Sequence, residues 1–344
     1  MPYKNVLVVG GGAIGGITAA LLTQKSENVI VLDTDKEHVK GMNKGLEISG
    51  FRRLLIPVRT MLPGEFSGKE YAGWADIVLL AVKGLHTESA LTSVLPSISK
   101  TAPVVSLQNG INEETIAKIV GVERTIACSI TWGGTNKGPG QLIQTTDGGF
   151  IIGQWPTGKS KIVDEAAALL SQAFPTEVSD NIIGDRWTKL LITVSLTGVG
   201  TTAGLTYGEV IDNEAARKVA LTVITETYDV GIKAGVKFAD LMGVSPSIVL
   251  VRNKADFDNA SKLLEMGFAN HRATKPSMWQ DIEKGRKTEV DFVNGYVVKK
   301  GREVGLKTPA NELVTKVIRE IEEGKRKPSL VNLKEFESIT DYIK

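Results

Sequence analysis

In the first half of the chain, short apolar runs alternate with amphipathic segments. The apolar runs are typical of buried strands and lie at 6–9, 29–32, 77–82 and 104–107. Apolar residues at helical spacing separate these runs, at 14–22, 35–42 and 88–95. A further segment, 54–60, is predicted to be extended. Strands that alternate with helices of this length predict a mostly parallel sheet that is buried on both faces.

The pattern changes from residue 125 onward. Three strand-like segments separated by Gly-rich turns predict antiparallel hairpins, at 126–131, 141–146 and 150–153. The second half is helical instead, with periodic segments at 181–197, 214–234, 261–266, 292–304 and 311–323. We therefore expect an α/β fold with a sheet domain of residues 1–181 and an all-helical domain of residues 182–344. No role is predicted for the segment 329–344.

A glycine-rich turn follows the first predicted strand and opens the first predicted helix. Its sequence, G-G-G-A-I-G at 10–15, fits the dinucleotide fingerprint G-x-G-x-x-G. Gly10 permits the tight turn, Gly12 lets the backbone approach a pyrophosphate, and Gly15 lets the helix pack close to the strand. The free N–H groups of the helix N-terminus then face the phosphates. We therefore expect a Rossmann-type sheet domain, and the alternative is a Gly-rich turn in an unrelated α/β domain. The expected cofactor-binding residues of this loop are Gly10, Gly12, Ala13, Ile14 and Gly15.

Asp33 ends the second predicted strand. A carboxylate at this place in the fold can accept a hydrogen bond from the 2′-hydroxyl of the adenosine ribose, and it repels a 2′-phosphate. Asp33 therefore favours NAD(H) over NADP(H). The alternative is that Asp33 and Asp35 only cap the helix that follows.

Polar residues follow two later strands of the predicted parallel sheet. Lys83 comes after the run 77–82, and Asn109 comes after the run 104–107. Ligands of open α/β sheets bind beyond the carboxyl ends of the strands, so both residues are candidates for the cofactor and substrate side. The alternatives are a solvated lysine and a turn asparagine before Gly110.

Lys189 and Glu289 are the candidate catalytic residues of the helical half. Lys189 lies between Trp187 and Leu190 on an apolar helix. Partial burial lowers the pKa of a lysine and makes it a useful proton donor. The alternative is a lysine whose stem lies along the helix while its amine reaches water. Glu289 opens a helix, where a carboxylate also interacts favourably with the helix dipole.

Six motifs taken together resemble those of the ketopantoate reductase (2-dehydropantoate 2-reductase) family. They are, in order, G-x-G-A-x-G at 10–15, Lys83, Q-N-G at 108–110, R-W-x-K-L at 186–190, S-M-x-Q-D-I at 277–282 and T-E-V-D-x-x-N-G at 288–295. The resemblance covers roughly residues 4–320. The last two motifs are specific to that family, whereas many dehydrogenases share the first.

The resemblance implies hydride transfer from a reduced nicotinamide to the ketone of a 2-oxo acid. The leading substrate is 2-dehydropantoate, and the implied pathway is pantothenate biosynthesis. Lys189 then acts as the general acid, and Glu289 binds the substrate hydroxyl or orients Lys189. Lys83 and Asn109 hold the nicotinamide ribose region and position the catalytic lysine, and Ser277 binds the substrate carboxylate or a nearby polar group. The implied substrate-binding residues are Asn109, Thr193, Thr197 and Ser277. The implied cofactor contacts beyond the loop and Asp33 are Lys83, Asn109 and Glu289.

The chain departs from the family pattern on the substrate side. Thr193, Thr197, Thr274 and Tyr207 stand where relatives of the type enzyme have asparagine. An asparagine amide donates and accepts with a longer reach than a threonine hydroxyl, so these changes predict a less polar pocket. The reaction class is therefore better supported than the substrate identity. Asp33 is a further departure, because the family commonly prefers NADPH, and NADP(H) stays open as the cofactor.

Three other functions remain open. The chain can be a paralogue that reduces another branched or bulky 2-oxo acid, or that oxidises the matching 2-hydroxy acid. It can also be a non-catalytic NAD-binding sensor, although a sensor needs the glycine loop and not the pair Lys189 and Glu289. Opine-type and 6-phosphogluconate-type dehydrogenases are disfavoured by the T-E-V-D-x-x-N-G match.

The amino-acid composition excludes several classes of binding partner and metal site. The 344 residues carry 41 basic and 39 acidic side chains, so no nucleic-acid partner is expected. A single cysteine, Cys128, excludes an internal disulfide and a multi-cysteine zinc site, and three histidines leave little for a metal centre. No apolar run is long enough for a membrane span, so we expect a cytoplasmic enzyme. The size of the helical half favours a homodimer.

Overall fold

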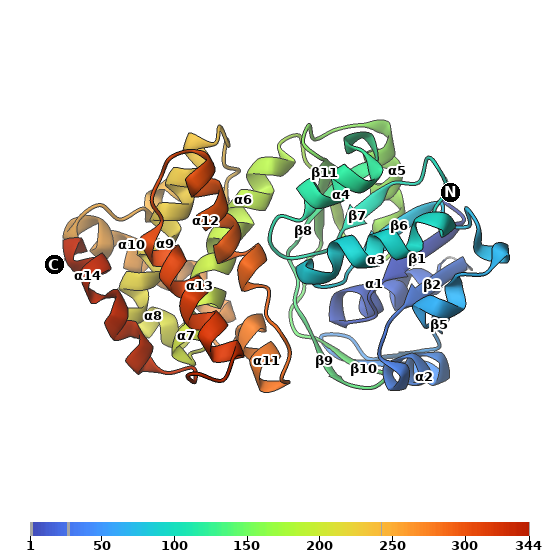
Figure 1. Cartoon of the computed structure of the whole chain (residues 1–344), viewed down its shortest axis with the longest axis horizontal. Coiled ribbons are helices and arrows are strands. Elements are labelled where there is room, and N and C mark those ends of the chain that lie inside the picture. Colours follow the sequence, from blue (N-terminus) through green and yellow to red (C-terminus); the bar gives the residue numbers. More distant parts are fainter. Residues whose placement is uncertain (1–2, 26–27, 242, 344) are drawn as a thin grey trace. The chain divides into compact units, whose positions relative to one another are not determined.

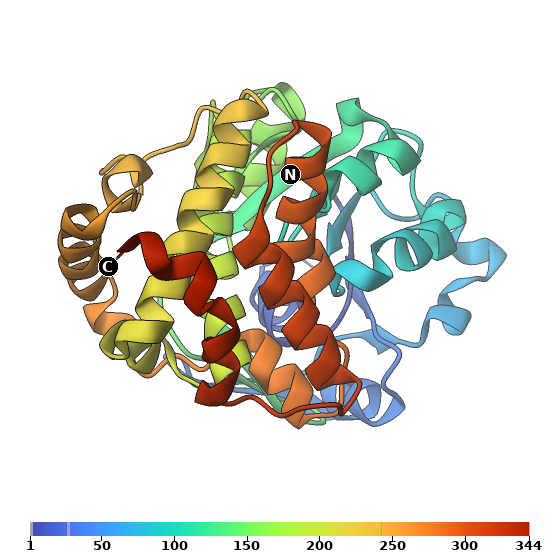
Figure 2. The ribbon, with the colours of Figure 1, turned by 60° about the vertical axis from the view of Figure 1, so that its left-hand side comes forward.

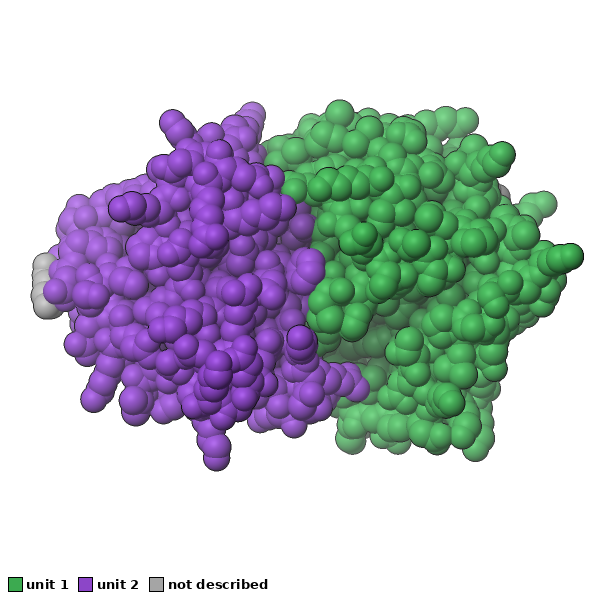
Figure 3. Space-filling model, in the orientation of Figure 1, with its two compact units in different colours: residues 1–108, 112–186 green, residues 109–111, 187–344 purple. Residues whose placement is uncertain are grey.

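The computed structural model describes residues 3–25, 28–241 and 243–343. The described residues form two compact units, which Figures 1 and 3 show. The sheet unit contains residues 1–108 and 112–186, and the helical unit contains residues 109–111 and 187–344. The mostly parallel sheet followed by helices confirms the predicted fold class. The predicted division into functional domains of residues 1–181 and 182–344 stays a prediction.

Eight strands of the described residues make the large sheet, in the order β12-β11-β8-β7-β6-β1-β2-β5. Their bounds are β1 (Asn5–Val9), β2 (Asn28–Leu32), β5 (Thr60–Met61), β6 (Ile77–Leu80), β7 (Val104–Ser106), β8 (Thr125–Ile130), β11 (Phe150–Gln154) and β12 (Thr176–Val178). Neighbouring strands run parallel except β8 and β11, which are antiparallel. The chain leaves β1 toward β2 on one side and returns to β6 on the other side.

Both faces of the large sheet are covered, which explains the continuous apolar runs. Val6 and Val8 of β1 are buried on one face with residues of α1 (Ala13–Thr23) and α5 (Lys161–Leu170). Leu7 and Val9 are buried on the other face with residues of α3 (Thr87–Val94) and α4 (Glu113–Val120). Successive side chains of a strand point to opposite faces, so every position of β1 from Val6 onward is apolar.

A second, smaller sheet joins two distant segments of the sheet unit. Within the described residues its order is β4-β3-β10-β9. The strands are β3 (Leu46–Gly50), β4 (Leu54–Ile56), β9 (Gly134–Gly138) and β10 (Gln141–Gln144). Strand β10 pairs antiparallel with β9 and parallel with β3. Leu142 of β10 lies against Gly16 of α1, where an added Cβ would be 2.6 Å from the leucine Cδ1.

The prediction of successive hairpins after residue 125 is wrong in its pairing. The segment 126–131 pairs with 150–153 inside the large sheet, as β8 with β11. The segment 141–146 belongs to the small sheet instead. Strand β9 escaped prediction because its residues, G-T-N-K-G, are polar or glycine and show no apolar alternation.

The helical unit is built around α9 (Glu214–Lys233), which is buried along most of its length. Figures 1 and 2 show α13 (Pro309–Glu322) beside it, and residues of the two helices are in contact. The other helices are α7 (Gly198–Ala203), α8 (Tyr207–Asp212), α10 (Lys254–Gly267), α11 (Ser277–Glu283), α12 (Asn294–Glu303) and α14 (Glu337–Thr340). Helix α6 (Ile182–Ile192) begins in the sheet unit and continues into the helical unit from residue 187. No helix of the described residues is both long and apolar enough to cross a membrane.

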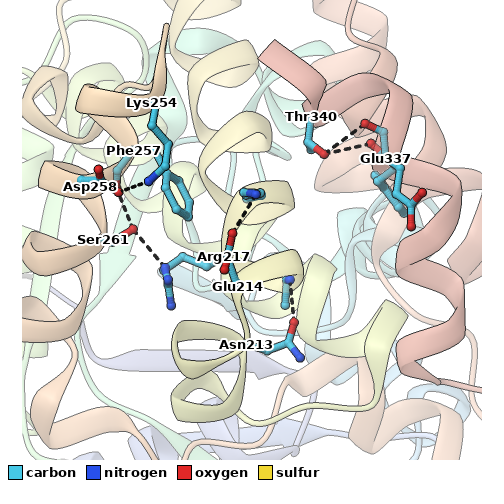
Figure 4. Close-up of polar contacts among 12 residues, drawn as sticks. Asn213, Glu214, Arg217, Lys254, Phe257, Asp258, Ser261, Glu337 and Thr340 are labelled. Carbon is cyan, nitrogen blue, oxygen red and sulfur yellow. Dashed lines mark hydrogen bonds and ion pairs between the residues drawn. The ribbon is translucent and has the colours of Figure 1, made fainter. Parts of the chain in front are cut away.

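Side-chain hydrogen bonds fix the start of α9 and its contact with α10 (Figure 4). The Asn213 side chain accepts the N–H of Ala216 and so caps α9. Arg217 Nε then donates to Ser261 Oγ of α10 at 2.9 Å. Ser261 in turn donates to the carbonyl of Phe257. Helix α10 is longer than the predicted segment 261–266, because its first half is mostly polar and carries little periodicity.

The predicted helix 181–197 is interrupted. Helix α6 ends at Ile192, residues Thr193–Thr197 form a π-helical turn, and α7 begins at Gly198. The segment after residue 328 is ordered as short helical turns and α14. Phe336 is buried there, and Asn332 Nδ2 donates to the carbonyl of Thr202 in α7 at 2.8 Å.

Candidate active site

The glycine loop has a shape that only glycine permits. Gly10 has φ +105°, and a Cβ there would lie 2.8 Å from the carbonyl carbon of Ala81. A Cβ on Gly15 would lie 2.0 Å from the Gly10 carbonyl oxygen. A Cβ on Gly12 would meet no atom within 4 Å, so the loop is open on that side. This combination fits a pyrophosphate, which needs a bare backbone that it can approach.

The loop lies at the point where the strand order of the large sheet reverses. Strands β1 and β6 are neighbours, so Gly10 and Lys83 follow adjacent carboxyl ends. The close approach of Gly10 to Ala81 brings the two segments together. Dinucleotides bind at such a reversal in doubly wound sheets. The sheet unit therefore brings Lys83 to the same edge as the glycine loop, as predicted from the order of strands.

Asp33 supports the glycine loop directly. Its Oδ2 accepts the N–H of Gly11 at 2.8 Å, and its Oδ1 accepts the N–H of Asp35 at 2.9 Å. The cap of α2 (Lys36–Gly45) is Asp35, whose Oδ1 accepts the N–H groups of Glu37 and His38. Asp33 is half-buried beside the loop, where its remaining lone pairs suit a ribose hydroxyl.

His38 is a loop-supporting residue that sequence reasoning missed. Its ring is buried, with Nε2 2.7 Å from the Gly11 carbonyl oxygen. Nδ1 lies 3.0 Å from the N–H of Gly140 and accepts from it, so Nε2 carries the hydrogen and donates to Gly11. Gly140 lies between β9 and β10, so one ring joins the glycine loop to the small sheet. A single histidine within an amphipathic helix gives no sequence signal of this role.

Arg186, near the start of α6, belongs to the R-W-x-K-L motif, but sequence reasoning gave it no role. It is buried, and Nη1 donates to the Cys128 carbonyl of β8 at 2.6 Å. Nη2 donates to the carbonyl of Gln108, just after β7, at 2.9 Å. The same Nη2 lies 3.0 Å from Oε1 of Glu113. Burial raises the pKa of Glu113, and the guanidinium charge opposes that rise.

Gln108 extends this network to β6. Its Nε2 donates to the carbonyl of Val82 at 2.7 Å and to Thr87 Oγ1 at 2.9 Å. Val82 directly precedes Lys83. The segments that follow β6 and β7, together with the middle of β8, are therefore tied to the first turns of α6 by buried hydrogen bonds. These buried hydrogen bonds hold the strand ends and the start of α6 in a fixed arrangement.

The predicted substrate-side residues belong to the helical unit. They are Asn109, Lys189, Thr193, Thr197, Ser277 and Glu289. Lys189 is half-buried on α6, and Thr193 Oγ1 donates to the Lys189 carbonyl at 3.1 Å. Ser277 is the first residue of α11 and is exposed, and α11 contacts the π turn. Glu289 is buried and precedes a 3₁₀ turn, Val290–Phe292.

The Q-N-G loop packs against the segment that follows Glu289. Gly110 has φ +72°, and a Cβ there would lie 2.3 Å from the carbonyl oxygen of Phe292. Residues 109–111 therefore belong to the helical unit although they follow β7 in the chain. The helical unit thus places the loop that contains Asn109 against the turn that follows Glu289.

Three of the positions that depart from the family pattern are connected. Thr197 Oγ1 hydrogen-bonds to the hydroxyl of Tyr207, and the Tyr207 N–H donates to the Thr274 carbonyl at 3.0 Å. Among the described residues, no three His, Cys, Asp or Glu side chains gather in a way that could hold a metal ion.

Comparisons with known proteins agree with these features. The family model for ketopantoate reductase PanE/ApbA matches residues 6–157, and the model for its C-terminal part matches residues 181–322. A 2-dehydropantoate 2-reductase from Pyrococcus horikoshii is 31% identical over 320 residues, which cover 92% of this chain and 96% of that protein. Both matches extend over the sheet unit and the helical unit.

Solved structures agree as well. The crystal structure of a PanE/ApbA family ketopantoate reductase from Ralstonia eutropha has a TM-score of 0.78 at 25% identity and covers 93% of this chain and 99% of that chain. A D-mandelate dehydrogenase with NADH and anilino(oxo)acetate shares the fold, with a TM-score of 0.80 at 24% identity over 93% of this chain and 99% of that chain. The chain therefore belongs to the ketopantoate reductase PanE/ApbA family of oxidoreductases.

Proposed function

We propose that this protein reduces the ketone of a 2-oxo acid, with NADH as the reductant and Lys189 as the general acid. The leading candidate substrate is 2-dehydropantoate. The observation that carries the proposal is the packing of the Q-N-G loop into the helical unit. Gly110 lies against the Phe292 carbonyl, so Asn109 is next to the segment that begins with Glu289. A binding-only protein needs the glycine loop but has no need for this arrangement of polar residues on the substrate side.

The sheet unit supplies the cofactor contacts in this proposal. The N–H groups of Gly12, Ala13 and Ile14 face the pyrophosphate at the start of α1. Asp33, already held by Gly11, accepts the ribose hydroxyl and disfavours a 2′-phosphate. The bound nicotinamide supplies the hydride. Lys83 and Asn109 orient the nicotinamide ribose.

Lys189 carries out the proton transfer in this proposal. Its protonated Nζ approaches the carbonyl oxygen of the substrate, stabilises the negative charge that develops there, and then gives up its proton. Glu289 is buried and either orients Lys189 or binds the substrate hydroxyl. Ser277 at the start of α11 donates to the substrate carboxylate. The balance is one 2-oxo acid, one hydride and one proton to one 2-hydroxy acid.

A different 2-oxo acid is the second candidate substrate. The hydroxyls of Thr197 and Tyr207 hydrogen-bond to each other, which leaves them fewer free donors for a polar substrate. This observation favours a substrate whose side chain is branched or bulky and apolar. The reaction and the roles of Lys189 and Glu289 are the same for either substrate.

The test is a panel of 2-oxo acids assayed with NADH and with NADPH. We expect the highest kcat/KM with NADH and 2-dehydropantoate, and a loss in kcat of about 10²- to 10⁴-fold for Lys189→Ala. Lys254→Ala is the control, because Lys254 is exposed on α10 and forms an ion pair with Asp258 one turn further along the same helix. A Lys189→Ala enzyme as fast as the wild type rules out the mechanism. NADH binding without turnover of any 2-oxo acid supports a sensor instead.

We also infer that the protein acts as a homodimer, because helical halves of this size in two-domain dehydrogenases commonly carry subunit contacts. Light scattering after size-exclusion chromatography tests this directly. A mass near the 37.0 kDa of one chain contradicts it.

A further inference from the structure

The π turn after Lys189 changes the hydrogen bonding of its helix. The N–H of Gly198 donates to the carbonyls of Thr193 and Ser195. In a regular α-helix this N–H donates four residues back, to the carbonyl of Val194. The wider turn therefore diverts the usual donor away from the Val194 carbonyl, in a buried part of the unit. A buried carbonyl needs a donor, and it comes from another helix.

Asn294, the first residue of α12, supplies that donor. Its Nδ2 donates to the Val194 carbonyl at 3.1 Å and to Asn311 Oδ1 of α13 at 3.0 Å. The Asn294 side chain is completely buried. Gly198 leaves room for it, since a Cβ on Gly198 would lie 2.7 Å from Asn294 Oδ1. The π turn and the asparagine therefore fit each other in both hydrogen bonding and space.

Asn311 is fixed in its turn by Glu226 of α9. The Asn311 Nδ2 donates to Glu226 Oε2 at 2.9 Å, and the Asn311 N–H donates to the same oxygen at 3.0 Å. Oε1 accepts the N–H of Ala310 at 2.8 Å. A buried line of hydrogen bonds thus runs from α9 through α13 and α12 to the π turn. Because each member is held by the next, Asn294 has a single orientation.

The wide turn also affects which side chains share a face. In a regular α-helix, side chains four residues apart are rotated by about 40°, and those eight apart by about 80°. A turn with i to i+5 bonds has more residues per revolution, which reduces this rotation. Lys189, Thr193 and Thr197 follow one another at spacings of four. The π turn therefore brings these three side chains closer to a common face of the helix.

We propose that Asn294 is a positioning residue for the reaction: by supplying the donor for the Val194 carbonyl, it keeps the π turn that aims Lys189 and aligns it with Thr193 and Thr197. The role rests on the proposed function of Lys189. Asn294 touches neither substrate nor cofactor in this role. It acts through the conformation of the helix.

The chain offers a matched control in Asn332. Asn332 is also buried, and its Nδ2 donates to a carbonyl of the same helical run, that of Thr202, and to the carbonyl of Lys327. We compare Asn294→Leu with Asn332→Leu in the full-length protein. Both variants are expected to unfold at lower urea concentration. Only Asn294→Leu is expected to lower kcat, by about tenfold or more, with little change in the KM for NADH. If Asn294→Leu does not fold, Asn294→Ser provides the same comparison.

A double variant separates this proposal from the proposed function. If Asn294 acts by aiming Lys189, adding Asn294→Leu to Lys189→Ala causes no further loss in kcat. Equal losses in kcat for the Asn294 and Asn332 variants, or multiplied losses in the double variant, overturn the positioning role. A Lys189→Ala enzyme with wild-type kcat overturns the proposed function itself, and this result is read from that single variant alone.

Discussion

The hydroxyl oxygens of Thr197 and Tyr207 lie 2.7 Å apart and form one hydrogen bond. Burial raises the pKa of Tyr207, and the bond to Thr197 opposes that rise, so the phenol stays protonated at neutral pH. Thr197 belongs to the π turn and Tyr207 begins α8. The pair therefore joins the turn after Lys189 to the start of α8.

Tyr207→Phe removes one partner of this bond and leaves the buried Thr197 hydroxyl without it. We expect the free energy of unfolding to fall by about 1 to 2 kcal/mol. The double variant Tyr207→Phe with Thr197→Val removes both polar groups, so it should lose less than the sum of the single losses. Urea denaturation measures all four proteins. Additive losses would mean that the two hydroxyls do not depend on each other.

Arg186→Met leaves the carboxylate of Glu113 buried without its charge partner. We expect a loss of about 3 to 5 kcal/mol in the free energy of unfolding. Replacing Glu113 with glutamine in the same protein should recover part of that loss. Arg252→Met is the control, because Arg252 pairs with Asp229 at the surface and should cost less than about 1 kcal/mol. Similar losses for the two arginine variants would contradict the prediction.

His38→Ala should weaken the binding of NADH, because the Gly11 carbonyl loses its donor and the glycine loop loses its support. The loss of one such hydrogen bond corresponds to about a tenfold higher Kd. Asn43→Ala is the matched control, since Asn43 lies on the same helix and exchanges two hydrogen bonds with Thr60 instead. Fluorescence titration with NADH measures both. Equal Kd values for the two variants would argue against a specific role of His38.

Asp185 should make stability depend on pH. Burial raises the pKa of Asp185 above its ordinary value of 3.8, and the nearby carboxylates of Glu177 and Asp180 add to the rise. Between that value and the raised pKa, the folded chain binds more protons than the unfolded chain. The free energy of unfolding therefore falls as pH rises through this window.

Asp185→Asn tests this dependence because it keeps an oxygen acceptor for Ser179 and cannot titrate. Urea denaturation from about pH 4 to about pH 7 should show a smaller fall in the free energy of unfolding for the variant than for the wild type. Asp164→Asn on α5 is the control, since Asp164 is exposed. An unchanged pH profile in Asp185→Asn would contradict the prediction.

The large sheet was predictable because its strands are buried on both faces and are therefore continuous apolar runs. Val6 to Val9 and Ile77 to Leu80 are of this kind. The small sheet was not predictable in the same way. The glycines and polar residues of β9 show no alternation, and the pairing of β10 with β3 joins segments far apart in the chain.

Some residues of the candidate site were also predictable from the sequence, whereas others were not. The glycine loop, Lys83 and Asn109 became candidates because each follows a recognisable strand. His38 and Arg186 were missed because their roles depend on backbone groups of other segments, such as the Gly140 N–H and the Cys128 carbonyl. The π turn could not be predicted from the sequence, because the four-residue spacing of Lys189, Thr193 and Thr197 suits a regular α-helix equally well.

The loop at residues 109–111 has a practical consequence for dissecting the protein. It lies in the chain between two stretches of the sheet unit, yet it belongs to the helical unit, where Gly110 lies against the Phe292 carbonyl. A fragment that starts at residue 187 therefore lacks a piece of its own unit, and a fragment that ends at residue 186 carries that piece without its neighbours. The gene cannot be cut once to yield two complete folding units. Mixing two separately produced halves is accordingly expected to restore less activity than the intact chain has.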